Sequence, residues 1–404
     1  MRLFNIALFI LVVAATVRAQ ALDCTASAPV TPHARAEGEA EPVGDVVVVC
    51  TGGTASAATL INVTLTLNTD LTSLTFATVP VTSEALLLID EPQPDAVNDS
   101  NGFSYSGQVL GTPFAAAGAP GSGNVYQAEQ SAPTSVTWSG VPFVAPGPDG
   151  TRTLRLTNIR ANASALQVGS SPAPVYATVS ATIPIGNPSQ IVAFVAPGLS
   201  FGEILVVGAT AQFTFRENFI YAFRMRITPA TEPLTKARQD IPGTYYYTES
   251  QFTPCFSYGD CSSPPAGPIG LATTPTLLLA RIANLGYAAG SVLLPNQVQS
   301  ETGSLAAALV VDPKMVRSAA GASYGGTYFV PVTDGSVDVL YEVAGSAGHF
   351  GCHCNDSFTI SAILYDRSTH AIGFPTATVF KGYLAPLELA ATASPTASRP
   401  RFAP

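Results

Sequence analysis

Apolar and polar side chains alternate along much of this chain. In residues 62–68, Val63, Leu65 and Leu67 share one parity, while threonine and asparagine take the other. The same alternation recurs at residues 152–157, 175–183, 337–343 and 358–364. A period of two places successive side chains on opposite faces of a β-strand. One apolar face per strand predicts antiparallel sheets, packed as sandwiches or barrels.

The longest alternating stretch covers residues 213–227. Its aromatic and aliphatic side chains share one parity, and its arginines and asparagine share the other. Glu217 falls on the apolar parity, which predicts a bend or bulge at that position. Residues 275–286, "TPTLLLARIANL", fit either a buried strand or a short helix.

Long segments rich in Gly, Pro, Ser, Asn and Asp interrupt this pattern and predict loops. They lie at residues 91–102, 111–124, 141–150 and 257–268. The segment "PIGNPSQ", residues 184–190, is the best candidate linker, and the chain exceeds the size of a single core.

The predicted fold is therefore all-β, with two antiparallel β-sandwich domains of Ig-like or jelly-roll-like type and long Gly/Pro-rich loops. We expect these domains at residues 20–188 and 189–388, followed by a disordered tail at 389–404 that is rich in Ala, Ser, Thr and Pro.

Residues 1–19 predict a secretory signal peptide. Arg2 precedes an apolar run from Ile6 to Val17. Small residues at positions 17 and 19 predict cleavage before Gln20. The apolar run is shorter than the roughly 18 residues that span a membrane, and no later stretch approaches that length. We therefore expect a secreted protein, extracellular or at the cell surface, without membrane insertion.

Charge is sparse and acidic. The 404 residues include 18 basic and 27 acidic side chains, and charged residues are 11% of the chain, where about 25% is usual. A formal net charge of −9 argues against electrostatic binding of nucleic acid or of an anionic membrane. The 34 glycines and 33 prolines favour turns over helices.

Four segments carry a resemblance to a known group. They are "EALLLIDEPQP", "GTRTLRLTNIRANAS", "QFTFRENFIYAFRMR" and "DVLYEV". With them the chain resembles exported β-rich proteins of unknown function that are numerous in soil acidobacteria. The resemblance covers most of the mature chain, rests on strand and turn motifs, and implies no activity or functional residue. The chain departs from that pattern after "YEV", where cysteines and histidines cluster.

The run "GHFGCHCNDSF", residues 348–358, holds the densest group of reactive side chains. His349, Cys352, His353 and Cys354 are residue types that bind zinc. Their spacing is poor, because on a strand His353 would point away from the two cysteines. The run is a weak candidate metal site, and we expect no metal or other cofactor.

Disulfides are the favoured role for the six cysteines of an exported protein. If bridges stay within domains, Cys24 pairs with Cys50. Cys352 and Cys354 would then bridge to Cys255 and Cys261, tying two loops together. Local pairs, Cys255 with Cys261 and Cys352 with Cys354, remain the alternative.

Other motifs carry weaker chemical signals. "GASYG" around Ser323 matches the serine-hydrolase pattern, and Asp334 or Asp338 with His349 could complete a triad, but the surrounding strands do not fit that fold. Oxygen-bearing side chains that could bind calcium are Asp90, Glu91, Asp95, Asn98 and Asp99. The run Tyr245 to Tyr247 could stack on sugars, whereas we expect Trp138 in the core.

These patterns together favour a secreted, non-catalytic structural or adhesive protein stabilised by disulfides. Its partner would be extracellular or on a cell surface, with polysaccharide as one class. The alternative is a carbohydrate- or calcium-binding β-sandwich module, and a serine hydrolase is a remote alternative.

Overall fold

The computed structural model describes ten segments of the chain. They are residues 21–55, 58–73, 75–76, 82–90, 125–219, 222–223, 276–303, 305–310, 326–345 and 356–384. These segments are nearly all β, with a single 3₁₀ helix, η1 (Ala163–Ala165), and no α-helix. Within them, no helix is long and apolar enough to cross a membrane.

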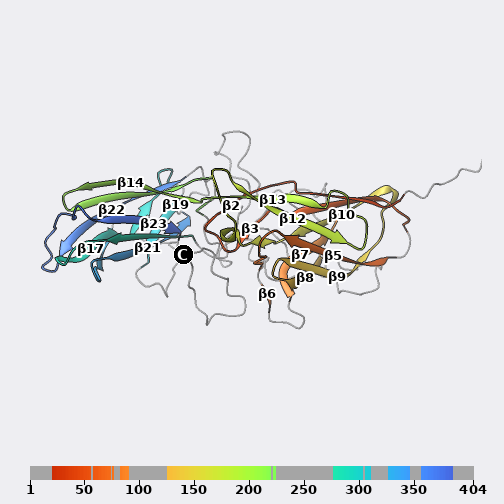
Figure 1. The fold of residues 1–404 in the computed structure, drawn as a ribbon, viewed down its shortest axis with the longest axis horizontal. Helices are drawn as coiled ribbons and strands as arrows, with labels where there is room; N and C mark the ends of the chain where they lie inside the picture. The colour runs from red at the N-terminus through yellow and green to blue at the C-terminus, as the bar shows by residue number, and fades with distance from the viewer. Residues whose placement is uncertain are drawn as a thin grey trace, which may run out of the picture.

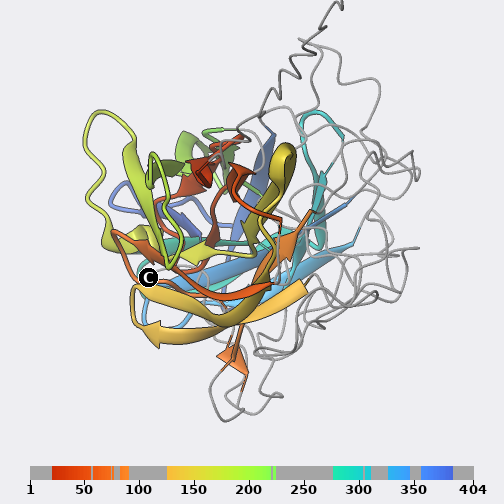
Figure 2. The same ribbon diagram turned by 90° about the vertical axis from the view of Figure 1, so that its right-hand side faces the viewer.

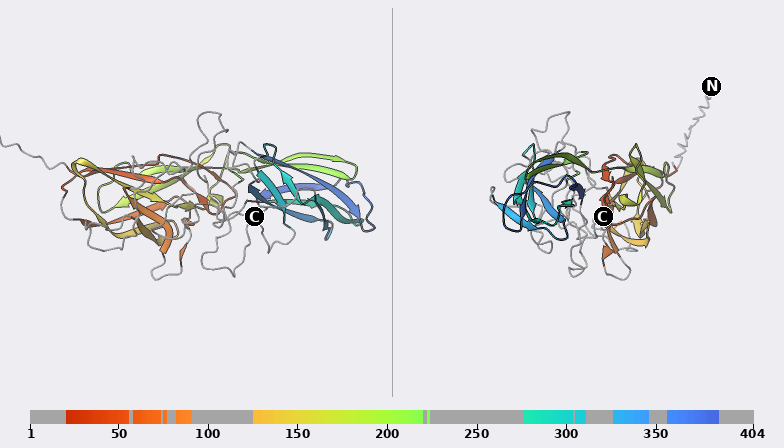
Figure 3. Two further views of the ribbon diagram at one scale, coloured as in Figure 1. Left: turned by 180° about the vertical axis from the view of Figure 1, so that it is seen from behind. Right: turned by 60° about the vertical axis from the view of Figure 1, so that its left-hand side comes forward.

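The strands form two units that follow one another along the long axis of the molecule (Figure 1). Views from behind and from the side keep the two units apart (Figure 3). We call described residues 21–196 the N-terminal unit and described residues 199–384 the C-terminal unit. Each unit has its own large cluster of buried apolar side chains.

Thirteen strands belong to the N-terminal unit. They are β1 (Asp23–Ser27), β2 (His33–Arg35), β3 (Glu41–Pro42), β4 (Val46–Gly52), β5 (Thr59–Leu67), β6 (Thr75–Phe76), β7 (Thr82–Ile89), β8 (Val125–Ala132), β9 (Ser135–Phe143), β10 (Gly147–Thr157), β11 (Arg160–Ala161), β12 (Ala173–Ala181) and β13 (Ser189–Ala196). Eleven of them form one sheet, in the order β1-β4-β10-β7-β8-β9-β5-β12-β13-β2 with β6 beside β7, while β3 and β11 form a separate pair. Among the described strands of this unit, β13 and β2 pair in parallel and the other strand pairs are antiparallel.

The large sheet curls around the first core (Figure 2). β1 is the first strand in the order of the sheet, and β12 and β13 are near the end of that order. The curl of the sheet brings β1 against the turn between β12 and β13. There the amide of Ala26 donates to the Gly186 carbonyl at 3.0 Å, and the Gly186 amide donates to the Cys24 carbonyl at 2.6 Å. Cys24 lies opposite Cys50 on β4 and forms the predicted disulfide. Trp138 is buried in the same core, as expected.

Ten strands belong to the C-terminal unit. They are β14 (Leu199–Val207), β15 (Thr210–Glu217), β16 (Leu277–Ala283), β17 (Ala289–Pro295), β18 (Gln297–Gln299), β19 (Leu305–Leu309), β20 (Thr327–Pro331), β21 (Val337–Gly345), β22 (Ser357–Asp366) and β23 (Val379–Leu384). They form two five-stranded sheets, β14-β15-β22-β17-β20 and β18-β19-β21-β16-β23. Side chains from both sheets contribute to the second core.

The alternation in the sequence predicts which side chains are buried. Val63, Leu65 and Leu67 of β5 are buried, and so are Val339 and Tyr341 of β21. The ambiguous stretch at 275–286 contains strand β16, so the helical interpretation is wrong. A β-rich fold is therefore confirmed for the described residues.

The predicted linker at 184–190 is instead part of the N-terminal unit. It contains the turn between β12 and β13, which pair with each other. Asn187 has φ 51° in this turn. The first core extends through Val195 and the second begins at Ala211, so the change of unit lies beyond the predicted division near residue 189. Proline and glycine suit a tight turn as well as a linker, so composition alone misplaces it.

The predicted loop at 141–150 is largely strand. β9 continues to Phe143 and β10 begins at Gly147, so only three residues lie between the two strands. The other predicted loops, at 91–102, 111–124 and 257–268, lie outside the described residues, as does the predicted tail.

Tyr341 provides a test of the second core. Its buried phenol donates to the Pro295 carbonyl at 2.9 Å, and burial raises the pKa of the phenol. The unfolded chain releases this proton near pH 10, whereas the folded chain retains it, so stability falls as the pH rises above 10. We expect Tyr341→Phe to lower the free energy of unfolding by about 1 kcal/mol at pH 8. Above pH 10 the wild type should lose about 1.4 kcal/mol of unfolding free energy per pH unit through this phenol, and the variant should not.

Urea unfolding at pH 8 and pH 11 measures both effects. The matched control is Tyr287→Phe, because the Tyr287 side chain is 98% exposed. This substitution should leave the unfolding free energy at pH 8 and its change at pH 11 as they are in the wild type. If the unfolding free energies of wild type and Tyr341→Phe differed by the same amount at pH 8 and pH 11, the buried Tyr341 phenol would not be a source of the alkaline loss.

Candidate functional site

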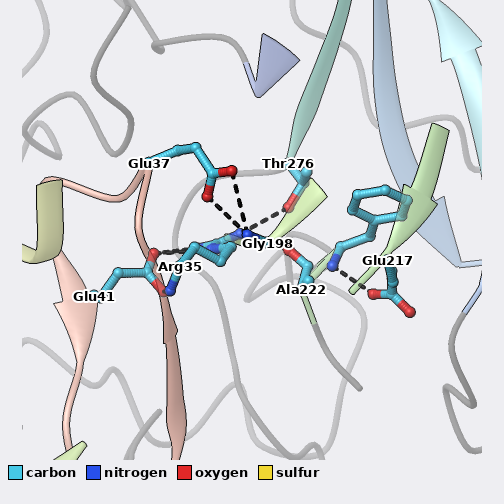
Figure 4. A network of polar contacts seen from close by, with 8 residues as sticks. Arg35, Glu37, Glu41, Gly198, Glu217, Ala222 and Thr276 are labelled. Carbon is cyan, nitrogen blue, oxygen red and sulfur yellow. Dashed lines mark hydrogen bonds and ion pairs between the residues drawn. The ribbon is translucent and has the colours of Figure 1, made fainter. Parts of the chain in front are cut away.

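A network of buried polar side chains lies where the two units meet (Figure 4). Arg35, at the end of β2, and Glu41, in β3, are 1% and 0% exposed. Two side-chain bonds join them: Nε of Arg35 donates to Oε1 of Glu41 at 2.9 Å, and Nη2 donates to the same oxygen at 2.6 Å. The Arg35 amide donates to Oε2 at 3.0 Å. Glu41 therefore fixes both the backbone and the guanidinium of Arg35.

Local sequence explains why these two residues meet. The Gly38 amide donates to the Arg35 carbonyl at 2.9 Å, which turns the chain back. A Cβ on Gly38 would lie 2.3 Å from Cγ of Glu41, so a side chain at position 38 would displace Glu41. Pairing of β3 with β11 then holds Glu41 in place.

The remaining nitrogen of Arg35 reaches into the C-terminal unit. Nη1 donates to the Ala222 carbonyl at 2.9 Å and to the Thr276 hydroxyl at 3.2 Å. Thr276 directly precedes β16, and its carbonyl accepts from the Val343 amide at 2.9 Å. One guanidinium from the N-terminal unit is thus bonded to two separate segments of the C-terminal unit.

The crossing between the units is only two residues long. Pro197 and Gly198 connect β13 to β14. The Gly198 amide donates to the Glu37 carboxylate at 2.9 Å, and its carbonyl accepts from the Asn218 amide at 3.1 Å. A Cβ on Gly198 would lie 2.6 Å from Cγ of Arg35, so the crossing packs directly on the arginine.

Glu217 extends this polar network within the C-terminal unit. It is buried at the end of β15, and its carboxylate accepts from the amides of Phe223 at 2.5 Å and Asp356 at 2.9 Å. The Glu217 amide donates in turn to the Asp356 carbonyl at 2.9 Å. The apolar parity of Glu217 therefore reflects a buried carboxylate that joins β15 to two other segments, at the place where the sequence predicts a bend.

The densest predicted cluster, His349, Cys352, His353 and Cys354, lies outside the described residues. The same holds for Cys255, Cys261, Ser323 and Tyr245 to Tyr247, so the predicted bridges, triad and stacking surface remain predictions. Within the segments that are described, no group of three or more His, Cys, Asp or Glu side chains could hold a metal ion.

Three acidic candidates are described. Asp334 is exposed in the turn between Thr333 and Ser336, whereas Asp338 and Asp90 both bind arginine. Asp338 of β21 accepts from Nε and Nη2 of Arg281 at 2.8 and 2.7 Å, and this hydrogen bonding lowers the pKa of Asp338. Asp90 forms an ion pair with Arg152 and accepts from the Thr153 amide at 2.8 Å. The other proposed calcium ligands, from Glu91 to Asp99, lie outside the described residues.

Sequence reasoning missed the Arg35 site. Its one local signal is an arginine and a glutamate on either side of Gly38, in a chain where charged residues are only 11% of the total. Comparison with known proteins adds no assignment, because neither a protein-family profile nor a curated protein sequence matches this chain.

Removal of Arg35 tests the site. Arg35→Met leaves Glu41 buried without the guanidinium, and breaking a buried pair in this way costs about 3 to 5 kcal/mol. The double variant Arg35→Met with Glu41→Leu should regain much of that loss, since no buried charge is left behind. Urea unfolding of the three proteins measures both effects.

The matched control is Arg281→Met. It removes an arginine bonded to a carboxylate at 2.7 Å, but both side chains are about half exposed. Solvent already screens such a pair, so the unfolding free energy should barely change. Equal losses for Arg35→Met and Arg281→Met would refute the importance of the buried site.

Proposed function

We propose that this chain is a secreted, non-catalytic structural or adhesive protein of the extracellular space. One observation carries the proposal: the two units are joined by a two-residue crossing and by a buried arginine that hydrogen-bonds to both of them. A protein that holds a fixed separation between its ends needs units that do not rotate freely. Units joined only by an exposed linker move relative to each other by default.

The polar groups at this junction support a mechanical role rather than a chemical one. Arg35 and Glu41 are buried against each other, and Glu217 accepts from backbone amides. Their hydrogen-bonding capacity serves the fold. A predicted signal peptide and a disulfide between β1 and β4 agree with export, because disulfides persist in oxidising compartments.

We also propose that the units are antiparallel β-sandwiches of the Ig-like or jelly-roll-like kind. Support comes from the C-terminal unit, where two five-stranded sheets share one core. In the N-terminal unit, the curled sheet would provide both layers around a single core. Such domains bury their apolar faces and leave polar faces toward solvent.

Expression of the full chain in a bacterial host tests the proposed function. We expect cleavage before Gln20, recovery in the exported fraction, and oxidised Cys24 and Cys50. Deletion of the gene in the producing cell should reduce attachment or cohesion of cells, and re-expression should restore it.

Two results would contradict this proposal. One is retention of the chain, with its leader, inside the cell. The other is labelling of Ser323 by a serine-reactive probe together with ester hydrolysis, both lost in Ser323→Ala, which would assign a hydrolase instead.

A further inference from the structure

The distal half of β14 exposes a continuous apolar run. Ile204, Leu205, Val206 and Val207 are 45%, 56%, 43% and 67% exposed. Successive residues of a strand point to opposite faces, so apolar side chains are exposed on both faces of this segment. Scattered exposed apolar residues are ordinary, but four in succession on one strand are not.

Among the described strands, the backbone of the same segment is paired on one side only. β14 is an edge strand there, hydrogen-bonded to β15. It begins at the junction between the units and runs toward the far end of the C-terminal unit (Figure 1). An edge strand presents unpaired amides and carbonyls that can extend a sheet across two chains.

The features that usually prevent an edge strand from pairing with another chain end just before residues 204–207. A register shift lies between Gly202 and Leu205, and Glu203 has φ 51° there. Glu203 accepts from Arg216 at 2.8 Å, so a bulge and a charge pair mark this part of the edge. Beyond it, residues 204–207 contain no charge and no proline, the two side-chain features that normally block pairing between edges.

We propose that residues 204–207 of β14 pair antiparallel with the same residues of a second copy of this chain. The segment is complementary to itself: any antiparallel register within 204–207 sets aliphatic side chains opposite aliphatic side chains. A two-fold arrangement places the same patch on both partners, as a closed dimer requires. The sparse charge of the chain limits repulsion between copies.

The size of the run determines the strength of pairing. Four aliphatic side chains are much less than the roughly 800 Å² that each partner contributes to a standard interface. The contact is therefore weak, and association depends on concentration. Tip-to-tip pairing at the end distant from the N-terminal unit joins two elongated molecules end to end. This inference rests on the proposed structural role, and it names the partner as a second copy.

Sedimentation velocity of the purified chain from about 1 μM to 1 mM tests the pairing, because that range covers weak interfaces. Wild type should shift from monomer toward dimer with rising concentration. Leu205→Lys should remain a monomer throughout, since a lysine on the edge opposes pairing. The matched control is Leu60→Lys: Leu60 is 49% exposed, but its strand β5 lies between β9 and β12 inside a sheet. This control should associate like wild type.

Hydrogen exchange of the wild-type chain gives a second measurement that needs no variant. Amides of 204–207 should gain protection at high concentration, while those of β5 should not change. A monomer at 1 mM, equal loss of association in both lysine variants, or unchanged exchange in 204–207 overturns the proposal. The proposal is also overturned if the chain stays monomeric and binds to phosphatidylcholine vesicles. If the protein dimerises but deletion of its gene does not reduce attachment or cohesion of cells, the contact at 204–207 is supported and only the structural role is rejected.

Discussion

A buried guanidinium, that of Arg35, determines how the two halves of this molecule fit together. Transfer of a charged group out of water costs several kcal/mol unless fixed partners replace the lost hydration. Glu41 supplies the opposite charge, and Ala222 and Thr276 supply oxygens from the other unit. Relative rotation of the units would remove those oxygens and leave the charge undersatisfied. The two-residue crossing at Gly198 packs on the same side chain, so the chain connection and the polar contact restrict the same motion.

This constraint links the fold to the proposed role. Each unit buries its own core, and the junction holds the cores at a fixed separation along the long axis. The exposed segment 204–207 lies at the edge of a sheet in the C-terminal unit, on a strand that starts at the junction. A rigid connection therefore fixes the direction in which this edge faces. An elongated molecule whose copies pair through residues 204–207 would suit the proposed structural or adhesive role, because its two ends would be held at a fixed distance.

The sequence predicts the short-range features of this structure well and the long-range ones poorly. Alternation identifies the inward face of β5 and β21, and cysteine position identifies the Cys24–Cys50 bridge. Those features depend on neighbours in one strand or on few possible pairs. The Arg35 site joins residues separated by up to 241 positions, and no local pattern encodes that meeting. Glu217 stands out by its parity, but its partners become evident only in three dimensions. The turn at 184–190 resembles a linker because Gly and Pro serve both.

Small-angle X-ray scattering of the purified chain, at concentrations below association, measures directly whether the junction at Arg35 is rigid. A rigid junction predicts one elongated particle whose scattering curve agrees with the arrangement in Figure 1. The curve should be the same at 0.15 M and 1 M salt, because a buried ion pair is screened far less than an exposed one. A curve that requires a broad distribution of distances between the two units, or that changes with salt, would contradict it.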